Sequence, residues 1–332
     1  MWAAWYERQG AASDVLKVGE LPDPTPAQGE VRVRLSRSGV NTGDVKKRAG
    51  WLGSAMPYPQ VVPHSDGAGV IDAVGAGADG ARVGQRVWVW GAQSCRAFGT
   101  AAEAVTIPER LAVALPDGVS DDVGATLGIP GITAHRAVFG DGPVDAQVVL
   151  VHGVLGGVGS FAAQLARWGG ATVIGSVRRG GDLGALPGVD HIVALDDPDV
   201  AAKVREIAPE GVDRIVEVAL SANIELDAEL VRSGAVIAAY ASPEPPTLPF
   251  WPLLFANVTL RLLGSDDFPA TAQDAATRDL SVAAADGALA ARIAPAYALD
   301  DIAAAHVAVE NGSHDCPVVI AVGATSRGLS GG

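Results

Sequence analysis

Two patterns of apolar and polar residues divide the chain. From Glu30 to Arg37 the letters EVRVRLSR alternate between apolar and charged residues, which is the period of a strand with one face in water. Residues 67–75 and 82–90 continue in short apolar runs that glycines interrupt. Up to the turn at 116–118, the chain therefore predicts mostly β structure with tight turns, in an irregular barrel.

Beyond that turn, the pattern changes to strands that alternate with helices. The run QVVLVH at 147–152 is typical of a buried strand, and it is followed by a predicted helix at 160–168 and a second strand at 171–176. The same alternation then predicts strands at 189–193, 211–218 and 235–239 and helices near 199–207 and 223–231. This order indicates a parallel sheet built from βαβ units. After Gly264 we expect an alanine-rich helix near 270–286, a short helix at 300–311 and a disordered tail at 324–332.

A glycine-rich turn separates the first strand of the α/β region from its helix. In this context glycines let backbone N–H groups and a helix N-terminus approach a diphosphate, so the turn predicts a dinucleotide site. The spacing is GxxGxxG rather than GxGxxG, and the alternative is a tight turn that binds nothing. The candidate ligands from this turn are Gly153, Leu155, Gly156, Gly157, Val158 and Gly159.

The end of the second strand indicates which dinucleotide is bound. NAD enzymes usually carry an acid there, about 20 residues after the glycines, to bind the ribose hydroxyls. This chain has Ser176, Arg178 and Arg179 instead. Because arginine matches a phosphate in geometry and charge, these residues favour NADP(H), with all three as candidate ligands of the 2′-phosphate. The alternative is that an arginine simply covers the edge of the sheet.

Several motifs resemble those of one enzyme group. The segment HGVLGGVG at 152–159, with AQLA at 163–166, is similar to the turn and helix of the zeta-crystallin-like quinone oxidoreductases, in the medium-chain dehydrogenase/reductase superfamily. Upstream, GVNTGD at 39–44 with RAG at 48–50, and PHSDGAGVI at 63–71, resemble two further segments of that group in the same order. The resemblance runs from about residue 15 to 322.

The resemblance implies an α/β protein with two domains. A GroES-like, β-rich catalytic domain at 1–123, completed by 265–323, would accompany a Rossmann domain at 124–264, a doubly wound parallel sheet that binds NADP(H). Residues 324–332 would form the disordered tail.

The resemblance also implies roles for individual residues. Further cofactor contacts are expected from Thr133, Ser221, Ala239, Tyr240 and Ala241. The candidate catalytic residues are Asn41, Lys46 and Tyr58, of which Lys46 replaces a tyrosine that is common in the group. The candidate walls of the substrate pocket are Trp51, His64, Phe250 and Trp251. The alternatives are that the side chain of Asn41 caps its loop, that Lys46 points to solvent, that His64 is a structural residue, and that the tyrosines and aromatic residues belong to the core or to an interface.

We expect no metal site. Zinc alcohol dehydrogenases share this architecture, but their first catalytic ligand is a cysteine where this chain has Asn41. His64 stands at their second ligand, with Ser65 at the position of a glutamate. A single histidine without these partners is insufficient to hold zinc.

Composition excludes several classes of partner. Lys and Arg total 24 against 38 for Asp and Glu, and a net charge of −14 opposes binding to nucleic acid or to an anionic membrane. Cys95 and Cys316 form neither a disulfide framework nor a thiolate metal site, which favours a cytoplasmic protein. No apolar run reaches the about 18 residues of a membrane span.

The sequence thus predicts an NADPH-dependent, zinc-free reductase of quinones or α,β-unsaturated carbonyls. The alternatives are an enoyl or enone reductase of a biosynthetic pathway and a non-catalytic, crystallin-like NADPH-binding protein. The apolar segment 257–264 reads as an edge strand, and related proteins pair such a strand across a two-fold axis, so we expect a homodimer.

Overall fold

The computed structural model describes residues 1–182, 184–264, 266, 268–312 and 316–322. The chain forms two compact units, the first from Met1–Ile129 with Ala291–Gly332 and the second from Pro130–Ala290. None of the helices in the described ranges has the length and apolar character that a membrane crossing requires.

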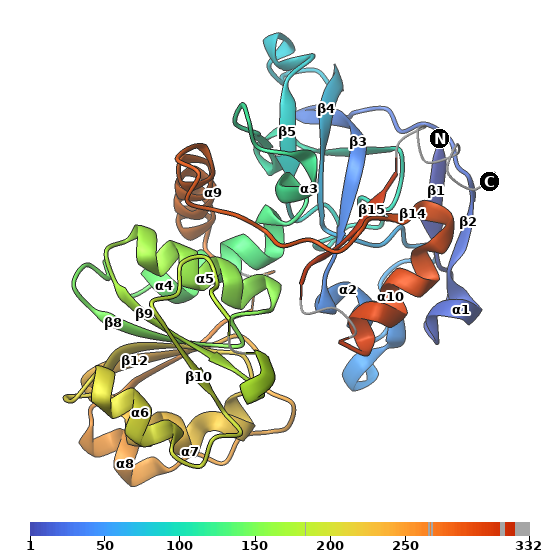
Figure 1. Ribbon diagram of the computed structural model, residues 1–332. Coiled ribbons are helices and arrows are strands. Elements are labelled where there is room, and N and C mark those ends of the chain that lie inside the picture. The colour runs from blue at the N-terminus through green and yellow to red at the C-terminus, as the bar shows by residue number, and fades with distance from the viewer. Residues whose placement is uncertain (183, 265, 267, 313–315, 323–332) are drawn as a thin grey trace. The chain divides into compact units, whose positions relative to one another are not determined.

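The first unit is built mainly on an antiparallel sheet (Figure 1). Its elements are β1 (Trp2–Trp5), α1 (Ala12–Val15), β2 (Lys17–Glu20), β3 (Glu30–Val40), α2 (Thr42–Ala49), β4 (Asp66–Val74), β5 (Arg86–Val89), β6 (Ala104–Pro108), β7 (Ala112–Ala114), α3 (Asp121–Gly124), β14 (Tyr297–Ala298), α10 (Ile302–Glu310) and β15 (Val318–Ala321). The strand order is β14-β15-β3-β4-β5-β7, and β6 also pairs with β3. The long strand β3 pairs with β4 along one edge and, along the other, with β6 at its start and β15 at its end. The C-terminal part of the chain therefore completes the sheet of the N-terminal domain, as the resemblance implied.

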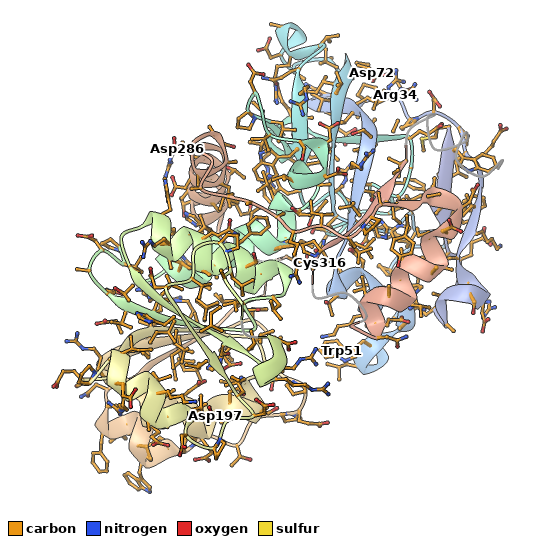
Figure 2. The ribbon with its side chains drawn as sticks, in the orientation of Figure 1. Arg34, Trp51, Asp72, Asp197, Asp286 and Cys316 are labelled. Carbon is orange, nitrogen blue, oxygen red and sulfur yellow. The ribbon has the colours of Figure 1, made fainter. Side chains whose placement is uncertain are left out.

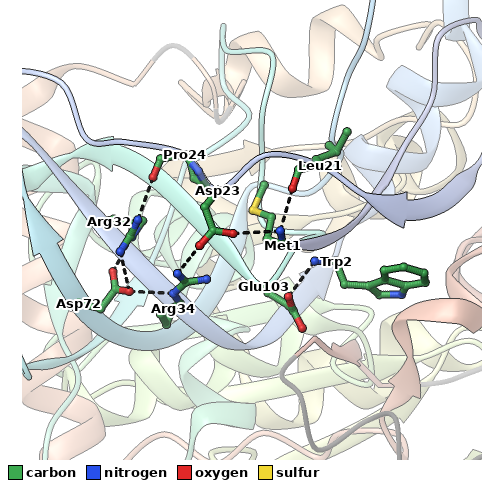
Figure 3. A network of polar contacts seen from close by, with 9 residues as sticks. All are labelled: Met1, Trp2, Leu21, Asp23, Pro24, Arg32, Arg34, Asp72 and Glu103. Carbon is green, nitrogen blue, oxygen red and sulfur yellow. Dashed lines mark hydrogen bonds and ion pairs between the residues drawn. The ribbon is translucent and has the colours of Figure 1, made fainter.

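A series of ion pairs connects the N-terminus of the chain to this sheet (Figure 3). The amino group of Met1 contacts Asp23 at 2.9 Å, Asp23 pairs with Arg34, and Arg34 Nε lies 2.7 Å from Asp72 of β4. Arg32 of β3 also binds Asp72, at 2.8 Å. Such partly exposed pairs contribute little to stability individually, so their main effect is to fix how β1 and its flanking loop lie along the sheet.

The second unit is a six-stranded parallel sheet in the order β10-β9-β8-β11-β12-β13. Its elements are α4 (Ile132–Phe139), β8 (Val148–His152), α5 (Gly157–Trp168), β9 (Thr172–Val177), β10 (His191–Ala194), α6 (Val200–Ile207), β11 (Val212–Glu217), α7 (Leu220–Leu230), β12 (Val231–Ala239), α8 (Phe250–Phe255), β13 (Thr259–Leu262) and α9 (Ala270–Ala285). Helices α4 and α5 cover one face, and α6, α7 and α8 cover the other (Figure 1). Burial on both faces explains why these strands read as continuous apolar runs.

The core of this sheet takes one large residue from each central strand. Leu150, Ile174, Ile215 and Ile237 come from β8, β9, β11 and β12, are fully buried, and pack with residues of α6 and α7. The parallel sheet predicted from the sequence is therefore present, with its carboxyl ends along a single edge.

The boundaries of the units differ from the expected ones. Residues 124–129 group with the first unit, and helix α9, which we expected to complete the N-terminal domain, groups with the second. The reason is that α9 packs on α4, where His135 Nε2 lies 2.9 Å from Asp279 Oδ2 and Leu280 is fully buried. The expected disordered tail at 324–332 lies outside the described residues.

Candidate functional site

The glycine-rich turn joins β8 to α5 as the sequence predicted. Gly153 has a φ of +68°, a region that favours glycine, and Gly156 is the N-cap of α5. A Cβ on Gly159 would lie less than 3.0 Å from the carbonyl oxygen of Gly153, so the helix crosses the turn at a distance only glycine allows. The first N–H groups of α5 lack partners within the helix and face out along its axis, which makes the turn suitable for a phosphate.

Two arginines follow the adjacent strand. Arg178 and Arg179 come directly after β9 and are exposed, and their side chains have no hydrogen bond or ion pair with any residue in the described ranges. The turn lies against this strand end, since the N–H groups of Gly153 and Val154 both donate to the carbonyl of Ser176. The structure therefore brings the glycine turn and two unpaired guanidinium groups together.

Ser176 lies elsewhere than we expected. Its side chain is fully buried, and its hydroxyl lies 2.7 Å from His152 Nδ1. The hydroxyl points into the sheet because Ser176 is still within β9, where side chains alternate between the two faces. Binding of the 2′-phosphate by Ser176 is thus corrected to a buried contact with His152.

His152 is the centre of a buried polar cluster below the turn. Its Nε2 lies 2.9 Å from Asp227 Oδ1 of α7 and 3.6 Å from Glu217 Oε2, at the end of β11. Burial by itself would lower the pKa of His152, but the hydrogen bond and charge of Asp227 and the charge of Glu217 outweigh it and raise this pKa. Burial raises the pKa of Glu217 to about 7, opposed by the charge of His152 and helped by that of Asp227. The charges of His152 and Glu217 thus shift each other's pKa in opposite directions, which couples their protonation.

The ends of β11 and β12 bring together the other expected cofactor residues. The N–H of Ser221 donates to Ser242 Oγ at 3.0 Å, and the N–H of Leu220 donates to the carbonyl of Ala241. Ala239 ends β12, and the N–H of Tyr240 donates to the carbonyl of Glu217. Burial, and then the charge of Glu217, raise the pKa of Tyr240, so its phenol stays protonated. These residues line the same carboxyl edge as the glycine turn.

Thr133 carries an orphaned hydroxyl. It stands in the first turn of α4 and is 4% exposed. Among the described residues, nothing hydrogen-bonds its Oγ1. A buried hydroxyl without a protein partner costs free energy, so its retention indicates a partner that binds there.

In the first unit, Asn41 is held by a buried carboxylate. Asn41 Nδ2 donates to Asp66 Oδ2 at 2.7 Å, and the same oxygen accepts the N–H of Ile129 at 2.8 Å. The backbone N–H of Asn41 also donates to Asp44, in the first turn of α2. Asn41 therefore does close its loop, as the alternative reading proposed, in a capping box with Asp44, and one N–H of its carboxamide has no partner within the described residues.

Lys46 points at an aromatic ring. Its Nζ lies 4.2 Å from the centre of the Trp51 ring. Trp51 projects from the turn after α2 and is half exposed (Figure 2). This cation–π contact holds the ammonium group near the surface rather than leaving it free in solvent.

Tyr58 and His64 are placed for other roles than those expected. The hydroxyl of Tyr58 donates to the carbonyl of Cys95 at 2.6 Å, which leaves its proton engaged in a loop contact. His64 is fully buried, with Nδ1 2.8 Å from Ser38 Oγ and Nε2 2.9 Å from His306 Nε2. Burial, and then the charge of His306, lower the pKa of His64 well below its usual value. His64 is therefore a neutral core residue, which fits its structural alternative rather than a pocket wall, and we no longer assign proton donation to Tyr58.

Phe250 and Trp251 lie away from the cofactor edge of their sheet. Both are exposed on α8, where Trp251 stacks on Phe255. The end of α8 is at the amino edge of the strands, because the carbonyl of Ala256 accepts the N–H of Gly234 at the start of β12. The aromatic residues of α8 thus form a surface cluster and not a wall beside the glycine turn.

Sequence reasoning missed Asp66, His306, Glu217 and Asp227. Glu217 gave a usable signal, since a carboxylate at the end of an apolar strand meets the other strand ends at the same edge. His152 and Asp66 both stand within the motifs of the family, where neither residue type by itself indicates a role.

Two family models match the chain. One, described as the alcohol dehydrogenase GroES-like domain, covers residues 27–117, and the other, described as zinc-binding dehydrogenase, covers residues 157–277.

Curated relatives are named as quinone oxidoreductases. The one from Homo sapiens is 30% identical over 234 residues, which are 69% of this chain and 70% of that protein. The one from Rattus norvegicus is 32% identical over 230 residues, 67% of each chain.

Solved structures of the same architecture cover almost all of the chain. A mycobacterial quinone oxidoreductase superposes with a TM-score of 0.80 at 27% identity, covering 97% of this chain and 99% of the other. A mycobacterial structure described as complexed with NADPH superposes with a TM-score of 0.79 at 25% identity and the same coverage.

Proposed function

The chain belongs to the zeta-crystallin-like quinone oxidoreductase family of the medium-chain dehydrogenase/reductase superfamily, and from this we propose that it transfers a hydride from NADPH to a quinone or an α,β-unsaturated carbonyl. The observation that carries the proposal is the pair of unpartnered arginines, Arg178 and Arg179, next to the glycine turn. NAD(H) has no 2′-phosphate, so two guanidinium groups at this point would have no phosphate to bind in a chain specific for NAD(H).

The residues present fit NADPH in three places. The turn from Gly153 to Gly159, where Gly153 has a positive φ and Gly159 leaves no room for a Cβ, suits the diphosphate, and Arg178 and Arg179 suit the 2′-phosphate. Ser221 and the loop at 239–241 would bind the nicotinamide ribose, and the orphaned hydroxyl of Thr133 would bind near the nicotinamide. Bound there, NADPH would supply the hydride.

Asn41 and Lys46 are our candidates for the acceptor side. Hydride transfer to a quinone or an α,β-unsaturated carbonyl builds negative charge on the carbonyl oxygen. A fixed N–H donor or a cation stabilises that charge. Asp66 fixes the carboxamide of Asn41 in one orientation, and the Trp51 ring fixes the ammonium of Lys46. Both groups are therefore preorganised and lose little side-chain freedom when they meet an oxyanion.

We propose that the reaction needs no zinc. Asn41 stands where zinc enzymes of this architecture have a cysteine, and both ring nitrogens of His64 are already bonded within the core. The buried side chains of His152, Glu217 and Asp227 place three atoms that could bind a metal within 4.8 Å of one another. A hydrogen bond between His152 and Asp227 explains this close approach without an ion.

The first experiment is to follow nicotinamide absorbance on protein treated with a chelator. We expect oxidation of NADPH with quinones or enones, much slower oxidation of NADH, and rates that chelation leaves unchanged. Inhibition that zinc reverses would overturn the metal-free mechanism. Faster turnover of enones would favour the enoyl or enone reductase, and NADPH-dependent thermal stabilisation without turnover would favour the non-catalytic protein.

We also propose a homodimer formed through β13. This strand is at the edge of the six-stranded sheet, and Leu262 on it is 71% exposed. An uncovered apolar edge strand favours pairing with a second copy across a two-fold axis. Light scattering should give a dimer for the native chain and a monomer for Leu262→Lys, whereas Val282→Lys, on the exposed face of α9, should remain dimeric. A monomeric native chain would contradict the proposal.

A further inference from the structure

The buried cluster of His152, Ser176, Glu217 and Asp227 joins four elements at the carboxyl edge of the sheet, including β8, which leads into the glycine turn, and α7, which carries Ser221. His152 ends β8, Ser176 lies in β9, Glu217 ends β11, and Asp227 belongs to α7. All four residues are at most 1% exposed. A shift of any one of them would therefore be transmitted to the loops that follow these elements.

Short contacts connect the cluster to those loops. Ser176, whose hydroxyl binds His152, accepts the N–H groups of Gly153 and Val154 on its backbone oxygen. On the other side, Glu217 accepts the N–H of Ala219 and both carboxylate oxygens accept from Asn223 Nδ2 at 3.1 Å. The cluster thus supports the diphosphate turn and the start of α7 together.

The charges of the cluster do not cancel in every protonation state. With His152 protonated and Asp227 ionised, the cluster is neutral if Glu217 keeps its proton and carries one negative charge if Glu217 loses it. Ionising both Glu217 and Asp227 would place two buried negative charges beside the single positive charge of His152. Glu217 therefore tends to keep its proton. The groups that face Glu217 are His152 of β8, Asp227 and Asn223 of α7, and Tyr240 after β12.

We propose that this cluster is a proton-linked positioning device for the nucleotide turn, in which Glu217 takes up a proton when NADPH binds. The inference rests on the proposed function, because its ligand is the dinucleotide assigned there. A diphosphate bound at the turn would bring negative charge close to the cluster, because Ser176 contacts both His152 and the N–H groups of the turn, and that charge would favour the neutral form of Glu217. By linkage, deprotonation of Glu217 must weaken nucleotide binding to the same extent.

Burial sets the pH range of the effect. Since burial raises the pKa of Glu217 to about 7, the free cluster loses this proton just above neutral pH. The affinity for NADPH should therefore be constant below that pH, fall above it, and level off once Glu217 is ionised in the complex too. We expect the dissociation constant to rise about fivefold across this range, the lower end of typical coupling between sites.

The test is calorimetry of NADPH and NADH binding at several pH values, in buffers that differ in ionisation enthalpy. At a pH of about 8, the 2′-phosphate, with a pKa of about 6, is already fully ionised, so proton uptake there must come from the protein. The native chain should take up a fraction of a proton with either nucleotide. Glu217→Gln, which keeps the shape and stays neutral, should bind without proton uptake and with an affinity that changes less than about twofold with pH.

A matched control lies on the same strand. Asp213 is at the start of β11, at the opposite edge of the sheet, where it binds Arg232 and the N–H of Val148. Asp213→Asn removes a carboxylate from the same unit and should leave proton uptake unchanged.

The outcomes separate the two proposals. Binding of NADPH by the native chain without proton uptake overturns the proton-linked cluster and leaves the proposed function intact. Uptake that persists in Glu217→Gln, or that Asp213→Asn abolishes, overturns it as well. No binding of either nucleotide overturns the proposed function and the linkage with it. Because the native chain alone gives the first of these results, the test does not depend on how well the variants fold.

Discussion

Replacing both Arg178 and Arg179 with alanine should raise the KM for NADPH about 100-fold and change the KM for NADH less than about threefold. A hydrogen bond to a charged group contributes about 1.5–3 kcal/mol, so two guanidinium groups on one phosphate account for a loss of this size. Neither side chain has a partner in the described part of the chain, so their removal should not disturb the fold. Initial rates with each nucleotide at a saturating quinone concentration measure both constants.

Two other arginines of the same unit provide a control for net charge. Arg167 pairs with Asp190 and Arg232 with Asp213, both at the amino edge of the sheet. The double variant Arg167→Ala with Arg232→Ala also removes two positive charges, but it should leave the ratio of the two KM values near that of the native chain. If the control lowers the preference for NADPH as much as the double variant at 178 and 179, the preference is a long-range charge effect and the phosphate site is wrong.

The local part of this site was predictable from sequence. A buried strand, a glycine-rich turn and a helix are properties of consecutive residues, and β8 and α5 begin within a few residues of their expected positions. The arginines after β9 were found in the same way, by their distance along the chain from the glycines. By contrast, helix α8 was not predicted, because residues 248–255 contain two prolines and an unbroken apolar run without helical periodicity.

The contacts that orient the side chains could not be predicted from the sequence, because they join residues that are far apart along the chain. His64 and His306 are 242 positions apart, and His152 and Asp227 are 75 apart. Each of these residues reads in isolation as an available polar group, and only the packing of the elements shows whether it is already bonded. For this reason the sequence analysis placed His64 in the substrate pocket and Ser176 at the 2′-phosphate, although both side chains are bonded in the core, and it missed Asp66, which orients Asn41.

Gly159→Ala should reduce NADPH affinity at least about 100-fold while the chain still folds. Its Cβ would lie less than 3.0 Å from the carbonyl oxygen of Gly153, which is backbone and unable to swing aside. The turn must then move away from α5, and a displacement of about 1 Å in a binding element is enough for a loss of this size. Overpacking of this kind costs about 1–3 kcal/mol of stability, partly offset by the helix propensity of alanine, which is about 1 kcal/mol better than that of glycine.

Gly156→Ala in the same turn distinguishes this clash from a general intolerance of side chains. At Gly156 the nearest atom to a Cβ is again the oxygen of Gly153, but at 3.5 Å, an ordinary van der Waals contact. Thermal unfolding should therefore shift for Gly159→Ala and remain near the native value for Gly156→Ala. NADPH titration of the two variants should give the weaker binding for Gly159→Ala, since only this substitution displaces the backbone. Equal affinities would mean that the close crossing of α5 over the turn does not position the groups that bind the nucleotide.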